Sequence, residues 1–151
     1  MGVKFPAVRK KLCARRSFFE RCCFKLKAAR LVAPQTFDFV ELDEPTPVDG
    51  EAKIRIEATS VCGSDIHGIY HGATPEEDYP LAPGVPCHEI AGTIVESKTD
   101  ELVEGQRAIV LPTRGMGGLS EYLVQTPDRV LPVPDWGGID ELVMCQHTGT
   151  V

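Results

Sequence analysis

Two short segments of this sequence contain the residue types that are best able to bind a metal or take part in a reaction. Cys62 is followed closely by Asp65 and His67, and later in the chain His88 is followed directly by Glu89. A cysteine thiolate and a histidine imidazole are ligands that zinc prefers, and a zinc ion that does chemistry needs three protein ligands and one open position. Cys62 and His88 can supply two of these three ligands.

The surrounding sequence predicts short strands that would place both segments on rigid supports. Residues 53–58 alternate polar and apolar side chains, which is typical of a half-buried strand. Further strands are predicted at 90–96, 106–111, 119–125 and 130–133. Gly92 suits a bulge or a close backbone approach. With 14 glycines and 12 prolines between the strands, the pattern favours a barrel or sandwich, with helix only at 65–70 and from about Gly138 onward.

Composition and charge exclude several classes of protein. The net charge of −6 is unevenly distributed along the chain. Residues 1–26 carry eight basic residues and one acidic residue, so the charge of the remaining residues sums to −13. An acidic main body argues against nucleic-acid binding. No apolar run approaches the roughly 18 residues that a membrane span needs. The six cysteines are irregularly spaced, which favours buried, metal-binding or catalytic roles over a disulfide framework.

The two segments together resemble those of the zinc-dependent medium-chain alcohol dehydrogenases, a family that includes sorbitol and threonine dehydrogenases. The resemblance runs from about Lys27 to Val151. It is carried by Cys62-Gly63-Ser64-Asp65-Ile66-His67, His88-Glu89-Ile90-Ala91-Gly92, Glu104-Gly105-Gln106-Arg107-Ala108-Ile109-Val110 and Gly118-Leu119-Ser120-Glu121-Tyr122. By this resemblance the fold is mainly β, a partly open GroES-like barrel with a few short helices.

The resemblance also implies a role for each residue that matches the family pattern. Cys62 and His88 correspond to the first two ligands of one catalytic zinc. Glu89 corresponds to the acid beside the metal, which can approach or transiently ligate it. Asp65 corresponds to the carboxylate that orients the ligand imidazole and raises its basicity.

The implied activity is NAD(P)-dependent oxidation of a primary or secondary alcohol or polyol to the carbonyl compound. Ser64 corresponds to the hydroxyl that takes the substrate proton first, and His67 to the outer end of that relay. Zinc would act as a Lewis acid that lowers the pKa of the alcohol, and the hydride would leave for the nicotinamide.

The third zinc ligand is where the match to the family weakens. Gln146 stands where the family has Cys, Glu or Asp, and Cys145 is adjacent. A neutral amide oxygen is a poor zinc ligand compared with a thiolate. Cys145 and Gln146 therefore stay as alternatives for the third ligand, with His147 as a further option. Cys87 is also unexpected, because the family usually has glycine there.

Two family features are absent from the sequence. Residues 96–115 contain no cysteine, so we expect no second, structural zinc. No Gly-x-Gly-x-x-Gly occurs, and the glycines at 115–118 fall between two predicted strands, which indicates a turn and not a phosphate loop. We therefore expect NAD(P) to bind only through a Rossmann domain that this sequence lacks.

These observations predict two regions. Residues 1–26 form a basic extension, disordered or artefactual, and residues 27–151 form the GroES-like domain, truncated at the start of the Rossmann domain. We expect a cytoplasmic fragment, inactive alone, from a homo-oligomeric enzyme with a small-molecule substrate and no nucleic-acid or membrane partner. The basic N-terminus leaves organelle targeting open. The alternative function is a stand-alone GroES-like binding module without catalysis.

Overall fold

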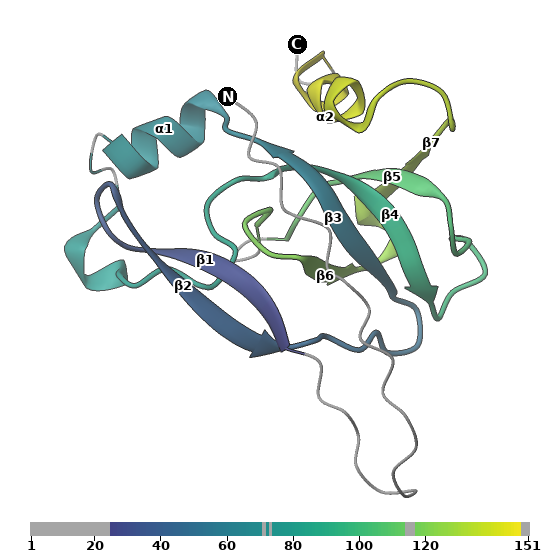
Figure 1. The fold of residues 1–151 in the computed structure, drawn as a ribbon, viewed down its shortest axis with the longest axis horizontal. Coiled ribbons are helices and arrows are strands. Elements are labelled where there is room, and N and C mark those ends of the chain that lie inside the picture. Colours follow the sequence, from purple (N-terminus) through teal and green to yellow (C-terminus); the bar gives the residue numbers. More distant parts are fainter. Residues whose placement is uncertain (1–24, 71, 73, 114–116, 149–151) are drawn as a thin grey trace, which may run out of the picture.

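The computed structural model describes residues 25–70, 72, 74–113 and 117–148 (Figure 1). The strands are β1 (Lys25–Ala33), β2 (Thr36–Asp43), β3 (Ala52–Ser60), β4 (Glu89–Ser97), β5 (Arg107–Val110), β6 (Tyr122–Gln125) and β7 (Val130–Val133). The helices are α1 (Gly63–Tyr70) and α2 (Ile139–Thr148), with short 3₁₀ helices at Glu76–Asp78 and Pro127–Arg129. Within this part of the chain the fold is mainly β with open sheets, which confirms the predicted fold class.

The strands form a hairpin and a larger antiparallel sheet. β1 pairs with β2, and the five-stranded sheet has the order β6-β3-β4-β5-β7. The hairpin is joined to the sheet through an isolated bridge between Ala28 and Ser120, just before β6. The backbone N–H of Ala29 donates to Leu119 O at 2.8 Å next to this bridge. The hairpin therefore extends the barrel wall beyond β6 without closing it.

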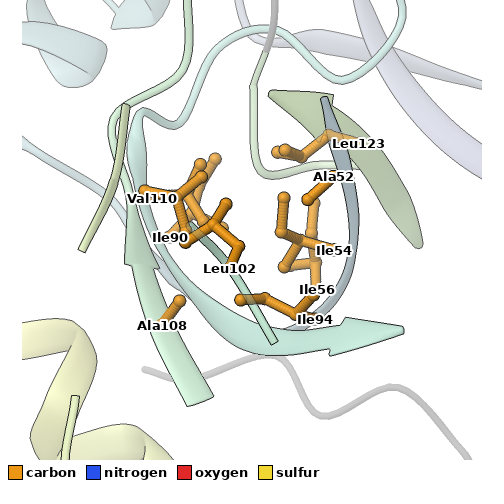
Figure 2. Packing of buried hydrophobic residues seen from close by; sticks show 10 residues of the cluster. Ala52, Ile54, Ile56, Ile90, Ile94, Leu102, Ala108, Val110 and Leu123 are labelled. Carbon is orange, nitrogen blue, oxygen red and sulfur yellow. The ribbon is translucent and has the colours of Figure 1, made fainter. Parts of the chain in front are cut away.

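Aliphatic side chains from both arms of the curved sheet fill its interior (Figure 2). Ile54 of β3 and Ile90 and Ile94 of β4 are fully buried there, with Leu123 of β6 covering one end. The predicted alternation explains this arrangement, because successive side chains of a strand point to opposite faces. The buried interior gives the rigid frame from which the loops project.

A bulge in β3 changes which of its side chains face the interior. The register between β3 and β4 shifts between Ile56, which lies opposite Gly92, and Ala58, which lies opposite Ala91. A bulge inserts one unpaired residue, so the side chains beyond it point to the other face. Ile56 accordingly packs in the interior, whereas Ala58 packs on the outer face.

Helix α2 covers that outer face. Leu142 and Val143 are 5% exposed and pack against Ala91 of β4, with Ala58 of β3 at the margin. In Figure 1 the helix lies over the end of the sheet at which β3 ends and β4 begins. The last turn of α2 is thereby brought to the first residues of β4.

No helix in the described ranges has the length and apolar character needed to cross a membrane.

The boundaries of the predicted elements differ from the structure in a few places. The five predicted strands and both helices are present, but β6 begins at Tyr122 instead of 119, because the preceding residues bridge to β1. The hairpin β1–β2 had no sequence prediction of its own. β1 begins at Lys25, so the last two residues of the predicted 1–26 extension belong to a strand, and Leu26 is buried. Residues 1–24, with Cys13, Cys22 and Cys23, lie outside the described residues.

Lys53 of β3 holds together charges from three segments. Its ammonium lies 2.8 Å from Glu44 and 2.9 Å from Glu96 of β4, and its side chain is only 12% exposed. Burial lowers the pKa of Lys53, but the hydrogen bonds to both carboxylates outweigh that effect and raise it above 10.5. The charged form of Lys53 is therefore favoured in the folded chain.

Gly92→Ala should destabilise the fold by about 1–3 kcal/mol, because a methyl group there would overlap the carbonyl oxygen of Arg55 on β3. Urea unfolding measures the change. Gly68→Ala in α1 is the matched control: its added carbon would make only an ordinary contact with Thr74, so stability should stay equal or rise by up to about 1 kcal/mol. Equal stability of the wild type and Gly92→Ala would contradict the close approach.

Lys53→Met should lower the free energy of unfolding at neutral pH by about 1–3 kcal/mol, because two carboxylates lose their charged donor. The folded chain holds the Lys53 proton more tightly than the unfolded chain, so this stabilisation is present below pH 10.5 and is lost as pH rises through the raised pKa. The difference between variant and wild type should therefore shrink in alkaline unfolding curves. Lys98→Met, which removes an exposed ammonium 3.9 Å from Glu96, should cost under about 1 kcal/mol.

Candidate metal centre

The site lies at the end of the sheet where β3 leaves and β4 begins. Cys62 follows β3 directly, and its carbonyl accepts the first hydrogen bond of α1, from Ile66 N at 3.1 Å. His88 immediately precedes β4, and Glu89 is the first residue of that strand. Because β3 and β4 are paired here, Ser60 opposite Glu89, the two segments predicted to bind metal come together.

Three side chains at this point can offer ligand atoms to one ion. The ligand atoms of Cys62, His88 and Glu89 all lie within 4.8 Å of one another. Glu89 is 4% exposed, whereas the His88 side chain is 46% exposed. The cluster is therefore covered by protein at Glu89 and open to solvent at His88. A sulfur, a nitrogen and an oxygen donor form a set that suits zinc.

Asp65 ties the two ligand segments together. Its Oδ2 accepts the backbone N–H of Cys62 at 2.9 Å, three residues earlier, as an acidic residue in the first turn of a helix can do. Its Oδ1 accepts the backbone N–H of Cys87 at 3.1 Å and lies 3.3 Å from Nδ1 of His88. Asp65 is 5% exposed. The contact with Nδ1 leaves Nε2 of His88 as the nitrogen that can bind a metal.

Gly117 and Gly118 pack against the segment that carries His88, and backbone hydrogen bonds join the two. Gly118 N donates to Cys87 O at 2.5 Å, and Leu119 N donates to Gly84 O at 3.0 Å. A Cβ at Gly117 would overlap the Gly84 carbonyl, so only glycine lets the two segments approach this closely. These two glycines lie between β5 and β6, where a turn was predicted, and they pack against the loop that carries His88.

Cys87 occupies a backbone conformation that glycine prefers. Its φ is +83°, and its side chain is 3% exposed. Burial, together with the nearby carboxylates of Asp65 and Glu89, raises the pKa of the Cys87 thiol to about 12. A metal ligand must be the thiolate. Cys87 is also outside the cluster of possible ligand atoms, so its neighbours and not its sulfur define the site.

The residues considered for the third ligand lie on the last two turns of α2, in different settings. The Cys145 sulfur faces its own helix, 3.8 Å from Glu141 O. Gln146 accepts from Ile90 N at 3.1 Å and donates to His88 O at 2.9 Å. His147 Nε2 lies 2.7 Å from Oε2 of Glu89. Neither the Cys145 sulfur nor the His147 imidazole belongs to the cluster of Cys62, His88 and Glu89, and both polar atoms of the Gln146 amide are bonded to backbone.

The predicted proton-relay residues lie on α1, beside the cluster. Ser64 and His67 are both exposed and are three residues apart, so they share one side of the helix. In the described ranges, Cys62, Cys87 and Cys145 are free thiols.

Sequence reasoning missed Ser60. Its hydroxyl donates a short hydrogen bond to Oε2 of Glu89 and lies 3.4 Å from Nε2 of His147. Unbroken alternation from Ile54 would have placed Ser60 on the interior face of β3. The bulge after Ile56 reverses this placement, and no signal in β3 itself marks the bulge. Only Gly92, across the pair on β4, indicated a bulge.

Comparisons with known proteins identify a family and several relatives of this chain. Residues 48–135 match the alcohol dehydrogenase GroES-like domain family. The chain is 33% identical over 123 residues to the starvation-sensing protein RspB of Escherichia coli K12, covering 77% of this chain and 35% of that protein. It is 41% identical over 59 residues to L-threonine 3-dehydrogenase of Pyrococcus horikoshii, covering 39% of this chain and 17% of that enzyme.

A solved structure has a similar fold over most of this chain. The alcohol dehydrogenase RspB of Escherichia coli CFT073, in complex with NADH, superposes with a TM-score of 0.63 at 26% identity, over 80% of this chain and 42% of that one. The chain thus spans about a third of the length of its RspB relative from strain K12. The family match covers more than half of the chain and includes Cys62, His88 and Glu89. The protein therefore belongs to the alcohol dehydrogenase GroES-like domain family.

Proposed function

We propose that this chain is the metal-holding part of a zinc-dependent, NAD(P)-linked dehydrogenase that oxidises a primary or secondary alcohol or polyol. The observation that carries the proposal is the meeting of Cys62, His88 and Glu89 within 4.8 Å. Three such ligands would leave one position open for a substrate oxygen. The exposed side of the His88 imidazole gives that substrate a way in.

We take Glu89 as the third ligand in preference to the alternatives on α2. Both polar atoms of the Gln146 amide already bond to the backbone of β4 and the residue before it. The Cys145 sulfur faces the carbonyl of Glu141. Glu89, in contrast, offers a buried carboxylate beside the other two ligand atoms, and a carboxylate oxygen is an ordinary zinc ligand.

A zinc ion bound here would supply Lewis acidity that lowers the pKa of an alcohol. Residues of the chain itself would position the ligands and transfer the substrate proton. Asp65 holds the His88 ring and both ligand loops, Ser64 takes the substrate proton, and His67 passes it to solvent. The exposed positions of Ser64 and His67 on α1 support this path.

The proposal places the nicotinamide outside these 151 residues, because they contain no dinucleotide-binding Gly-x-Gly-x-x-Gly. We expect the chain by itself to bind zinc without turning over alcohol. The substrate class is supported by the dehydrogenases to which the chain is similar, including those for threonine and sorbitol.

Cys62→Ser should abolish retention of zinc, measured as metal content after dialysis and as affinity in competition with a chromophoric chelator. A serine hydroxyl stays protonated near neutral pH and cannot replace a thiolate. Cys145→Ser should keep the zinc, because its sulfur lies outside the cluster. Zinc loss from Cys145→Ser would instead assign Cys145 as a ligand. Absence of stoichiometric zinc from the wild type would favour a binding module without catalysis.

Asp65→Asn should weaken zinc binding by about 10- to 100-fold, because a residue that orients a ligand is worth that much in metal affinity. The amide keeps the size of the side chain but loses the charge, and its NH₂ group would face backbone N–H donors. Asp43→Asn, at a carboxylate that is 71% exposed, is the control and should leave affinity unchanged. Equal zinc affinity for both variants would show that Asp65 does not orient His88.

A further inference from the structure

The packing of α2 aims its last turn at Glu89. Leu142 and Val143 anchor the helix against Ala91. Residues four apart share a face of a helix, so Gln146 and His147 continue the packed face that Leu142 and Val143 begin. The family match ends at residue 135, before α2, so this contact is not a feature that the match itself supplies.

The Gln146 amide forms hydrogen bonds with the backbone on both sides of Glu89. It accepts from the N–H of Ile90, the residue after Glu89, and donates to the carbonyl of His88, the residue before it. A side chain needs both a donor and an acceptor to make these two bonds, and an amide has both. An ionised carboxylate can only accept, and a cysteine thiol is weak in both roles. This double role gives a physical reason for an amide at a position where the family pattern has a metal ligand.

The His147 imidazole and the Ser60 hydroxyl hold the carboxylate itself. Ser60 donates to Oε2 of Glu89, and Nε2 of His147 lies 2.7 Å from the same oxygen, where the tautomer that carries its proton on Nε2 donates as well. A buried carboxylate is costly unless hydrogen bonds replace its lost water, and these two donors do so. Because both contacts use Oε2, a cation that binds Oε1 would leave both of them in place.

From these contacts we propose that Gln146 and His147 are positioning residues that hold Glu89 as a fixed third ligand, so that α2 supports the metal site without coordinating the metal. This inference rests on the proposed function, since it requires that Cys62, His88 and Glu89 bind zinc. It adds that the strength of binding depends on a helix outside the ligand set.

The test compares zinc affinity in variants of the 151-residue chain by chelator competition. His147→Ala and His147→Phe, which remove the donor with and without loss of ring volume, should bind zinc about 10- to 100-fold more weakly. His147→Gln can place an amide N–H near the position of Nε2 and should recover most of the affinity. Met144→Ala, at a side chain on the same helix that is 51% exposed, is the matched control and should not change it.

Two further measurements separate positioning from a general structural effect. In a Glu89→Gln background, His147→Ala should cost nothing more, because the carboxylate that it holds is already gone. With Co²⁺ in place of zinc, His147→Ala should change the ligand-field bands but keep the thiolate charge-transfer band of Cys62. The ligand-field bands report the coordination geometry of the ion, whereas the charge-transfer band reports the thiolate, so a change confined to the first would not be expected from a merely destabilised fold.

The outcomes distinguish this inference from the proposed function. If the wild type binds zinc stoichiometrically but His147→Ala and His147→Phe stay within about twofold of it, the positioning role is wrong and the function stands. The positioning role is equally wrong if the loss of affinity persists in the Glu89→Gln background. If the wild type fails to bind zinc, the proposed function fails and the inference fails with it.

Discussion

The geometry of the site depends on one buried carboxylate. Asp65 accepts backbone hydrogen bonds from Cys62 and Cys87 and contacts the ring of His88, so a single side chain joins the loop after β3 to the loop before β4. Charge-assisted hydrogen bonds are stronger than neutral ones, and burial keeps water from competing for them. Two loops that are far apart in the sequence are thereby held close enough to share an ion.

The second constraint is the bulge opposite Gly92. The close approach of β4 to Arg55 requires a residue without a Cβ, and the extra residue in β3 turns Ala58 and Ser60 to the outer face. Without that reversal, the Ser60 hydroxyl would be directed into an aliphatic interior, where it would have no polar partner. The bulge thus lets one strand serve the core with its first half and the site with its second half.

The site also depends on how α2 is seated. Its apolar residues meet Ala91, whose small side chain lets the helix approach the sheet closely. The polar residues one turn later then reach the start of β4. Packing energy from the apolar contact therefore sets the position of polar groups whose own interactions are individually modest.

Much of the architecture could be predicted from the sequence. Alternation in β3 and glycine and proline punctuation between strands indicated a mainly β domain, because periodicity of two is a local property of the chain. The pair of Cys62 and His88 with Glu89 was recognisable because the residue types that suit zinc are few. The hairpin β1–β2 was not predicted, although residues 36–43 alternate apolar and polar side chains except at Val40. Alternation by itself does not determine which face is buried, and Phe39 is 78% exposed.

What the sequence by itself determined is therefore the chemistry available and the strands that carry it. What only the tertiary structure decided is which groups meet: that Asp65 reaches both loops, that Ser60 turns toward Glu89, and that Gln146 bonds to backbone. These contacts join residues that are up to 58 positions apart in the chain. A local pattern reports the preferences of its own segment, whereas such contacts depend on register, bulge and helix packing, which are properties of the whole fold.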